Sequence, residues 1–140
     1  MSIDQTVALG VFGGSGFYEF LDGAEDIHIT TPYGAPTGPV TVGFVGDHRV
    51  AFMPRHGREH GFAAHRVPYR ANVWAMHAVG VRSLIAPCSV GSLQPDIHPG
   101  NIVVIDQLVD RTWGRPDTFH DVGAPATEPA AAGPVHHQSF

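Results

Sequence analysis

The chain has 140 residues, a formal net charge of −5 at pH 7 and 43% hydrophobic residues, which suits one globular domain or part of a larger one. The acidic balance argues against a nucleic-acid partner, and the apolar runs are too short to cross a membrane. The first residues, MSIDQTVALGVF, lack the basic flank of a secretory signal, and a single cysteine excludes an internal disulfide framework. We therefore expect a cytoplasmic protein.

The first predicted element is a buried strand over residues 7–12, VALGVF, which is short, apolar and rich in β-formers. It runs into GGSG at 13–16, where glycines leave backbone N–H groups open to an anion and Ser15 adds a hydroxyl. The run matches neither the dinucleotide fingerprint nor the Walker loop. A phosphate loop and a plain tight turn both remain open.

Two further strands are predicted at residues 39–45 and 48–53, joined by a hairpin turn at Gly46–Asp47. The second strand leads into PRHGREH, where Pro54 ends the strand and Gly57 permits a sharp bend. Arg55 and His56 then lie at the carboxyl end of the strand, where α/β sheets tend to bind ligands.

The basic residues are all arginines, and four of them fall between positions 55 and 70. Glu59 is the acidic residue that opposes them locally. Because a guanidinium group can hold a phosphate or carboxylate through two hydrogen bonds, the cluster indicates either an anion site or a solvated basic face. The four are Arg55, Arg58, Arg66 and Arg70.

The histidines of this region also allow a weaker hypothesis, a metal site formed by His56, His60 and His65. The zincin pattern H-E-x-x-H is absent, and Gly57 disfavours a helix that would hold the first two. We therefore expect no metal.

A helix is predicted over residues 68–79, with proline in its first turn, an apolar stripe through Tyr69, Val73 and Met76, and Gly80 as its cap. Residues 81–87 and 101–106 then read as strands, the first of them buried, with a PGN turn before the second. Cys88 follows the strand at 81–87, and no neighbouring base marks it as a nucleophile.

The sequence changes character near its end. We expect residues 1–121 to be the N-terminal part of one domain, 122–134 an Ala/Pro/Gly-rich flexible stretch, and 135–140 the start of a further segment.

Four motifs together resemble the 5′-methylthioadenosine phosphorylase group of purine nucleoside phosphorylases: GGSGFY, PRHGREH, HRVPYRANVWA and CSVGSL…PGN…DQLVDRT. They match its N-terminal half in order and spacing. The resemblance implies an α/β fold with a mixed central sheet flanked by helices, and a homotrimer. It also implies phosphorolysis of S-methyl-5′-thioadenosine or a related purine nucleoside to free purine and a ribose 1-phosphate, in purine and methionine salvage, with no cofactor.

The resemblance also implies roles for particular residues. His137 would close the 5′ pocket of a neighbouring subunit, whereas Asp106 and Asp110 would be structural, and purine recognition with protonation of the leaving base would come from the family's later half. No catalytic residue is assigned, and a non-catalytic phosphate- or nucleoside-binding fragment is the alternative. The implied phosphate ligands are Ser15, Arg55, His56, Cys88 and Ser89.

Overall fold

The structure is a computed structural model that describes residues 7–14 and 21–119. Its elements are a five-stranded sheet, one α-helix and one turn of 3₁₀-helix. No helix in the described part of the chain is both long and apolar enough to span a membrane. In chain order the elements are β1 (Leu9–Gly13), β2 (Asp22–Ile27), β3 (Val40–Val45), β4 (His48–Pro54), η2 (Ala64–Arg66), α1 (Tyr69–Ala78) and β5 (Ser83–Ile85).

The sheet is mixed, with strand order β2-β3-β4-β1-β5. The strands β2, β3 and β4 pair antiparallel, whereas β1 lies parallel to β4 on one side and to β5 on the other. The carboxyl ends of β1, β4 and β5 therefore lie at the same end of the sheet. This α/β architecture with a mixed sheet confirms the predicted fold class.

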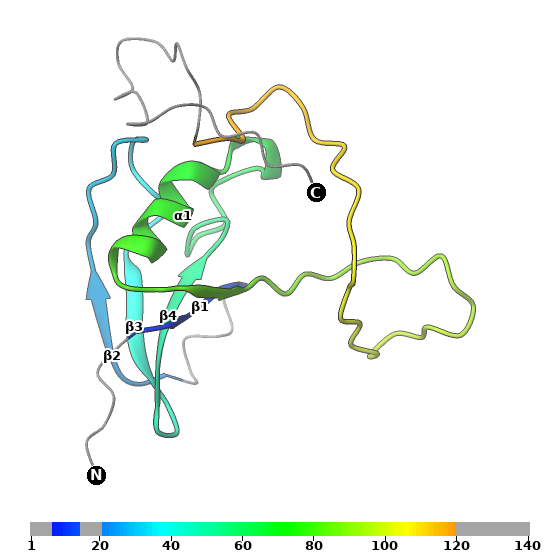
Figure 1. The fold of residues 1–140 in the computed structure, drawn as a ribbon, viewed down its shortest axis with the longest axis horizontal. Coiled ribbons are helices and arrows are strands. Elements are labelled where there is room, and N and C mark those ends of the chain that lie inside the picture. The colour runs from blue at the N-terminus through cyan, green and yellow to red at the C-terminus, as the bar shows by residue number, and fades with distance from the viewer. Residues whose placement is uncertain (1–6, 15–20, 120–140) are drawn as a thin grey trace.

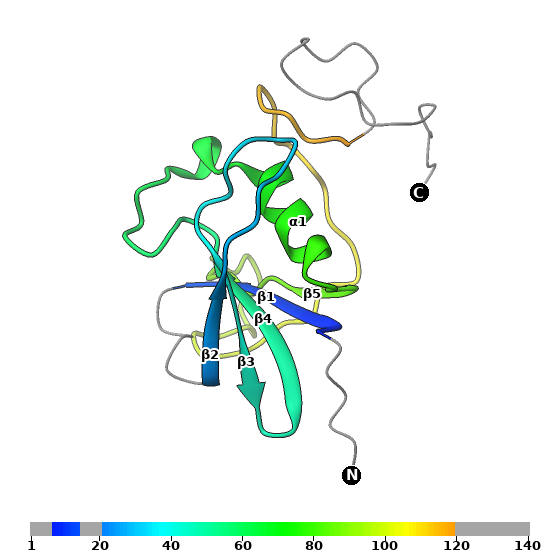
Figure 2. The ribbon, with the colours of Figure 1, turned by 90° about the vertical axis from the view of Figure 1, so that its left-hand side faces the viewer.

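The core lies between α1 and one face of the sheet, which the helix covers (Figures 1 and 2). The helix buries Ala75 and Met76 completely against this face. Met53 of β4 is also fully buried, so β4 contributes to the centre of the core. Apolar burial of this kind supplies most of the stabilisation of such a layer.

Several predicted elements are confirmed. The strands β1, β3 and β4 and the helix α1 lie within one or two residues of their predicted ends. Gly46 has φ 59° in the hairpin turn, and Gly80 has φ 106° at the end of α1, where its N–H donates to the His77 carbonyl. The PGN turn also forms, closed by a hydrogen bond from the Asn101 N–H to the His98 carbonyl.

Two sequence expectations are wrong, and one strand was missed. The strand β2 was not predicted, because its sequence DGAEDI is acidic and its residues are almost all exposed at the sheet edge. The predicted buried strand at 81–87 is shorter and exposed, since β5 is the opposite edge and pairs on one side only among the described residues. Residues 101–106 are exposed and form no strand, because no described segment pairs with them.

Candidate functional site

Arg55 lies where three loops meet. Its backbone N–H donates to the Gly13 carbonyl at 3.3 Å, and its guanidinium Nη2 donates to the Pro87 carbonyl at 3.4 Å. The segments that follow β1, β4 and β5 are therefore neighbours, as parallel strand ends require. Cys88 and Ser89 follow Pro87 directly and are exposed.

Of the predicted phosphate ligands, the structure thus brings together Arg55, His56 and the segment of Cys88 and Ser89, at the carboxyl ends of the parallel strands. Ser15 and His137 lie outside the described residues.

The imidazole of His56 is oriented by its own loop. Its Nδ1 lies 2.9 Å from the Phe62 carbonyl oxygen, and the Phe62 N–H donates to the His56 carbonyl at 3.3 Å. A carbonyl can only accept, so Nδ1 carries the proton and Nε2 remains for a ligand. The ring of His60 stacks almost parallel on that of His56, with centroids 6.4 Å apart, and His60 itself has φ 51°. The loop thus holds His56 in one tautomer and one orientation.

The bend after β4 depends on Gly57. Its φ of 79° lies in the left-handed region, and a Cβ there would come 3.3 Å from the Thr37 carbonyl oxygen. The hydroxyl of Thr37 donates to the Pro54 carbonyl at 3.0 Å, and its N–H donates to the Asn72 Oδ1 at 2.9 Å. Asn72 is buried in α1, so the end of β4 is tied to the helix.

Arg58 connects the same loop to the strands β2 and β3. Its Nη2 donates to both carboxylate oxygens of Asp26, at 2.6 and 2.7 Å, and to the Thr41 hydroxyl at 3.1 Å. Thr41 is buried and its hydroxyl also donates to Asp26 at 2.6 Å. These hydrogen bonds, Thr41 first and then Arg58, outweigh partial desolvation and lower the pKa of Asp26.

Replacing Asp26 by asparagine should lower the free energy of unfolding at pH 7 by about 1 kcal/mol or less, because the ion pair is partly exposed. The pKa of Asp26 is lower in the folded state, so its contribution is present above the unfolded pKa and lost as pH falls through the folded pKa. The difference between wild type and Asp26→Asn should therefore shrink below about pH 4. Urea unfolding at several pH values measures it.

Asp22→Asn on the same strand is the matched control and should change the free energy of unfolding by no more than about 0.5 kcal/mol. A difference for Asp26→Asn that stays constant down to pH 2 would contradict the assignment.

The four clustered arginines do not form one anion site. Arg58 binds Asp26, whereas Arg66 and Arg70 line a separate cavity of about 270 Å³ at the start of α1. There Arg70 lies 5.1 Å from the Tyr33 ring centroid and donates to the Thr118 carbonyl at 3.2 Å. Arg55 alone of the four lies at the junction of the three strand-end loops. The four arginines are close together in the sequence, but the fold places them in different surroundings.

The described residues include no group of three histidine, cysteine, aspartate or glutamate side chains able to hold a metal ion. The His56 Nδ1 is instead engaged by the Phe62 carbonyl. The structure therefore gives the metal hypothesis no support.

Asp110 makes local contacts, accepting hydrogen bonds from the Thr112 hydroxyl at 2.7 Å and N–H at 2.9 Å, and these lower its pKa.

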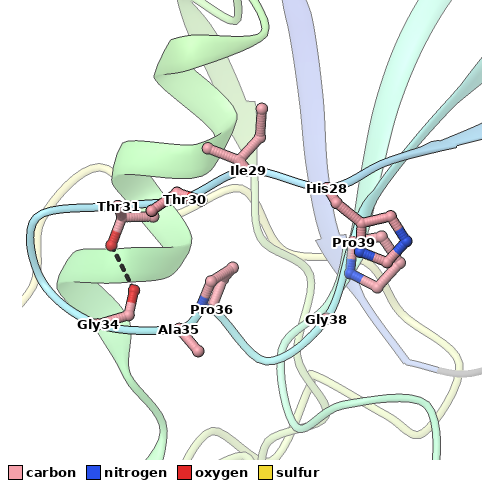
Figure 3. A pocket seen from close by; sticks show the side chains of 9 residues that line it. All are labelled: His28, Ile29, Thr30, Thr31, Gly34, Ala35, Pro36, Gly38 and Pro39. Carbon is pink, nitrogen blue, oxygen red and sulfur yellow. Dashed lines mark hydrogen bonds between the residues drawn. The ribbon is translucent and has the colours of Figure 1, made fainter.

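A larger hollow of about 550 Å³ lies in the connection between β2 and β3, which begins at the carboxyl end of β2 (Figure 3). Residues of this single connection line it, and the Thr31 hydroxyl donates to the Gly34 carbonyl across its outer turn. Neither it nor the smaller cavity includes Arg55, His56, Cys88 or Ser89.

The network that orients the loop was missed from the sequence. Asp26 and Thr41 lie on strands that precede the loop by many residues, and Asn72 lies on the following helix. The sequence showed only an excess of arginines over local acids in PRHGREH, and this excess does not identify Asp26 as a partner.

Known proteins share this arrangement of strands. The chain is 62% identical over 116 residues to the S-methyl-5′-thioadenosine phosphorylase of Mycolicibacterium smegmatis, covering 82% of this chain and 45% of that protein. It is 48% identical over 128 residues to the purine nucleoside phosphorylase of Streptomyces coelicolor, covering 91% and 45%. The structure resembles the methylthioadenosine phosphorylase of Schistosoma mansoni in complex with adenine, with a TM-score of 0.73, 41% identity, and 84% and 43% coverage.

The chain thus spans about 45% of the length of the curated relatives that it matches. Residues 8–138 match the family model described as the phosphorylase superfamily. This match extends over most of the sequence, so the chain belongs to the phosphorylase superfamily.

Proposed function

We propose that the chain forms the phosphate-binding part of a pentosyltransferase that cleaves S-methyl-5′-thioadenosine, or a related purine nucleoside, with inorganic phosphate. The observation that carries the proposal is the position of Arg55, whose N–H and guanidinium join the ends of β1, β4 and the segment after β5. The names of the relatives support the substrate class.

In this mechanism phosphate binds among Ser15, Arg55, His56 and the segment of Cys88 and Ser89. A phosphate oxygen attacks C1′ of the ribose as the bond from C1′ to the purine nitrogen breaks, and the base leaves with its electron pair. The anion both attacks and stabilises the positive charge that develops on the ribosyl group. Arg55 stays charged throughout, and the His56 Nε2 accepts or shares a phosphate proton.

The proposal extends to the complete protein. Residues 1–121 belong to one phosphorylase domain, 122–134 form a connection, and 135–140 begin the next segment. The protein is a cytoplasmic homotrimer in which His137 closes the 5′ pocket of a neighbouring subunit, and it uses no metal or organic cofactor. The resemblance of the motifs supports the trimer, and the single cysteine supports a reducing compartment.

A chimaera tests the proposal directly. The 116 residues of this chain that match the M. smegmatis relative replace their counterparts in it, and adenine release from S-methyl-5′-thioadenosine is measured with and without phosphate. Phosphate-dependent release is the expected result. A folded chimaera that binds phosphate without turnover would favour a non-catalytic phosphate-binding role for this chain.

Cys88→Ser should retain most of the activity of this chimaera, because phosphate is the nucleophile and the exposed thiol has no catalytic role. Steady-state kinetics and intact mass measure the outcome. Loss of activity together with a covalent adduct on the unmodified protein would contradict this expectation.

A further inference from the structure

A tight turn after β4 carries two of the candidate phosphate ligands. The Gly57 N–H donates to the Pro54 carbonyl at 3.0 Å, which closes a β-turn with Arg55 and His56 at its two central positions. Pro54 and Gly57 at the ends of the turn are buried, whereas Arg55 and His56 are half-buried. The orientation of both ligands therefore depends on how this turn is held.

Thr37, in the connection between β2 and β3, contacts both ends of the turn. Its hydroxyl donates to the same Pro54 carbonyl at 3.0 Å, across 17 positions of sequence. Its own carbonyl oxygen packs against Gly57, where an added Cβ would come within 3.3 Å of it. A residue that belongs to neither β4 nor the loop after it thus supports the turn.

Asn72 of α1 fixes the position of Thr37. The Thr37 N–H donates to the Asn72 Oδ1 at 2.9 Å, and the Thr37 hydroxyl lies 3.3 Å from the same oxygen. A hydroxyl has one proton to donate and the Pro54 carbonyl is the nearer acceptor, so the N–H is the main link to Asn72. Asn72 is 2% exposed. The turn is therefore connected, through Thr37, to the buried side of the helix.

We propose that Thr37, held by Asn72, is a positioning residue of the candidate phosphate site, and that its hydroxyl raises phosphate affinity by fixing the turn. A binding site needs supporting residues that keep its ligands within about 0.5 Å of the productive geometry. Thr37 acts through Arg55 and His56 and does not itself have to touch phosphate. This role rests on the proposed function, since it concerns the affinity of the same site for inorganic phosphate.

Thr37→Val replaces the hydroxyl by a methyl group that cannot donate. A methyl carbon contacts an oxygen at about 3.3–3.6 Å, so it would displace the Pro54 carbonyl, which lies 3.0 Å from the hydroxyl. The lost hydrogen bond and this displacement should weaken phosphate binding by roughly 2- to 12-fold. Thr37→Ser keeps the donor and should bind phosphate to within about twofold of wild type.

The matched control is Thr31→Val in the same connection. The Thr31 hydroxyl donates to the Gly34 carbonyl within its own loop, so this variant loses a comparable hydrogen bond away from the turn. Its phosphate affinity should stay within about twofold of wild type. Asn72→Ala removes the acceptor of the Thr37 N–H and should weaken phosphate binding. Combined with Thr37→Val, its effect should be less than additive, because both changes act through one turn.

The test titrates inorganic phosphate calorimetrically into the full 140-residue chain and into the chimaera, and measures the phosphate KM and kcat of adenine release by the chimaera. A residue that only stabilised the fold would lower the folded fraction and hence kcat, with little change in KM. For a positioning residue, the Kd and KM for phosphate rise in Thr37→Val and return in Thr37→Ser. Circular dichroism checks that the variants are equally folded.

Two results would overturn the proposal: wild-type phosphate affinity in Thr37→Val, or an equal loss of affinity in Thr31→Val. Failure of the proposed function is distinguishable, because it would appear as phosphate binding that depends on the Thr37 hydroxyl without release of adenine. A wild-type chimaera that binds no phosphate would overturn both.

Discussion

The 140-residue chain alone should release adenine from S-methyl-5′-thioadenosine roughly 100- to 10,000-fold more slowly than the M. smegmatis relative at saturating phosphate. This factor is the usual contribution of general acid catalysis. The resemblance of the motifs assigns protonation of the leaving purine to the family's later half, which this chain does not match. In the proposed mechanism phosphate binds at the strand ends, but this chain supplies no group that activates the leaving base.

Incomplete burial adds to the loss of activity. Ordering each residue costs about 1–2 kcal/mol of backbone entropy, and the exposed apolar side chains of β5 and of residues 101–109 offset little of it. Circular dichroism with thermal unfolding should accompany the assay. Phosphate-dependent turnover close to that of the relative, from a chain that unfolds cooperatively, would contradict the prediction.

Replacing Arg55 by alanine in the chimaera should weaken phosphate binding by roughly 10- to 150-fold, because a charge-assisted hydrogen bond contributes about 1.5–3 kcal/mol. The side chain also bonds the Pro87 carbonyl, so its loss frees the segment that carries Cys88 and Ser89. The dependence of adenine release on phosphate concentration measures the effect. Arg55→Lys keeps the charge but not the planar fork, and should give an intermediate loss.

Arg82→Ala is the matched control for Arg55. Its guanidinium donates to the Val81 carbonyl at 2.8 Å, just before β5 and at the opposite end of the strands from Arg55. Phosphate dependence should not change in this variant. An Arg55→Ala chimaera with normal phosphate dependence would remove Arg55 from the site.

The elements predicted correctly are those whose conformation depends mainly on residues close to them in the sequence. The hairpin was predicted from Gly46–Asp47 between two β-rich runs, and the end of α1 was predicted from Gly80. The apolar stripe predicted for α1 is confirmed only in part, because Met76 is buried whereas Tyr69 and Val73 are half-buried. Arg55 and His56 were placed correctly because a strand that stops at a proline has its next residues at the sheet edge.

Expectations that depended on distant partners failed. Burial of β5 and pairing of residues 101–106 require a neighbour that the described residues do not provide. The arginine cluster was interpreted as one group because Asp26, which binds Arg58, comes from a strand that had no hydrophobic signal. Periodicity reports which face of an element is apolar, but not what covers it.

The position of β1 in the sheet sets an order for folding. It is the first of the described strands along the chain, yet Leu9 pairs with Val50 on one side and Ser83 on the other. The hairpin of β3 and β4 joins neighbours in sequence and can form in about 1–10 μs, whereas both parallel pairings must close long loops. During synthesis on the ribosome, β1 therefore has neither of its two partners until β4 has emerged, so the strand that ends beside the candidate phosphate site is completed late.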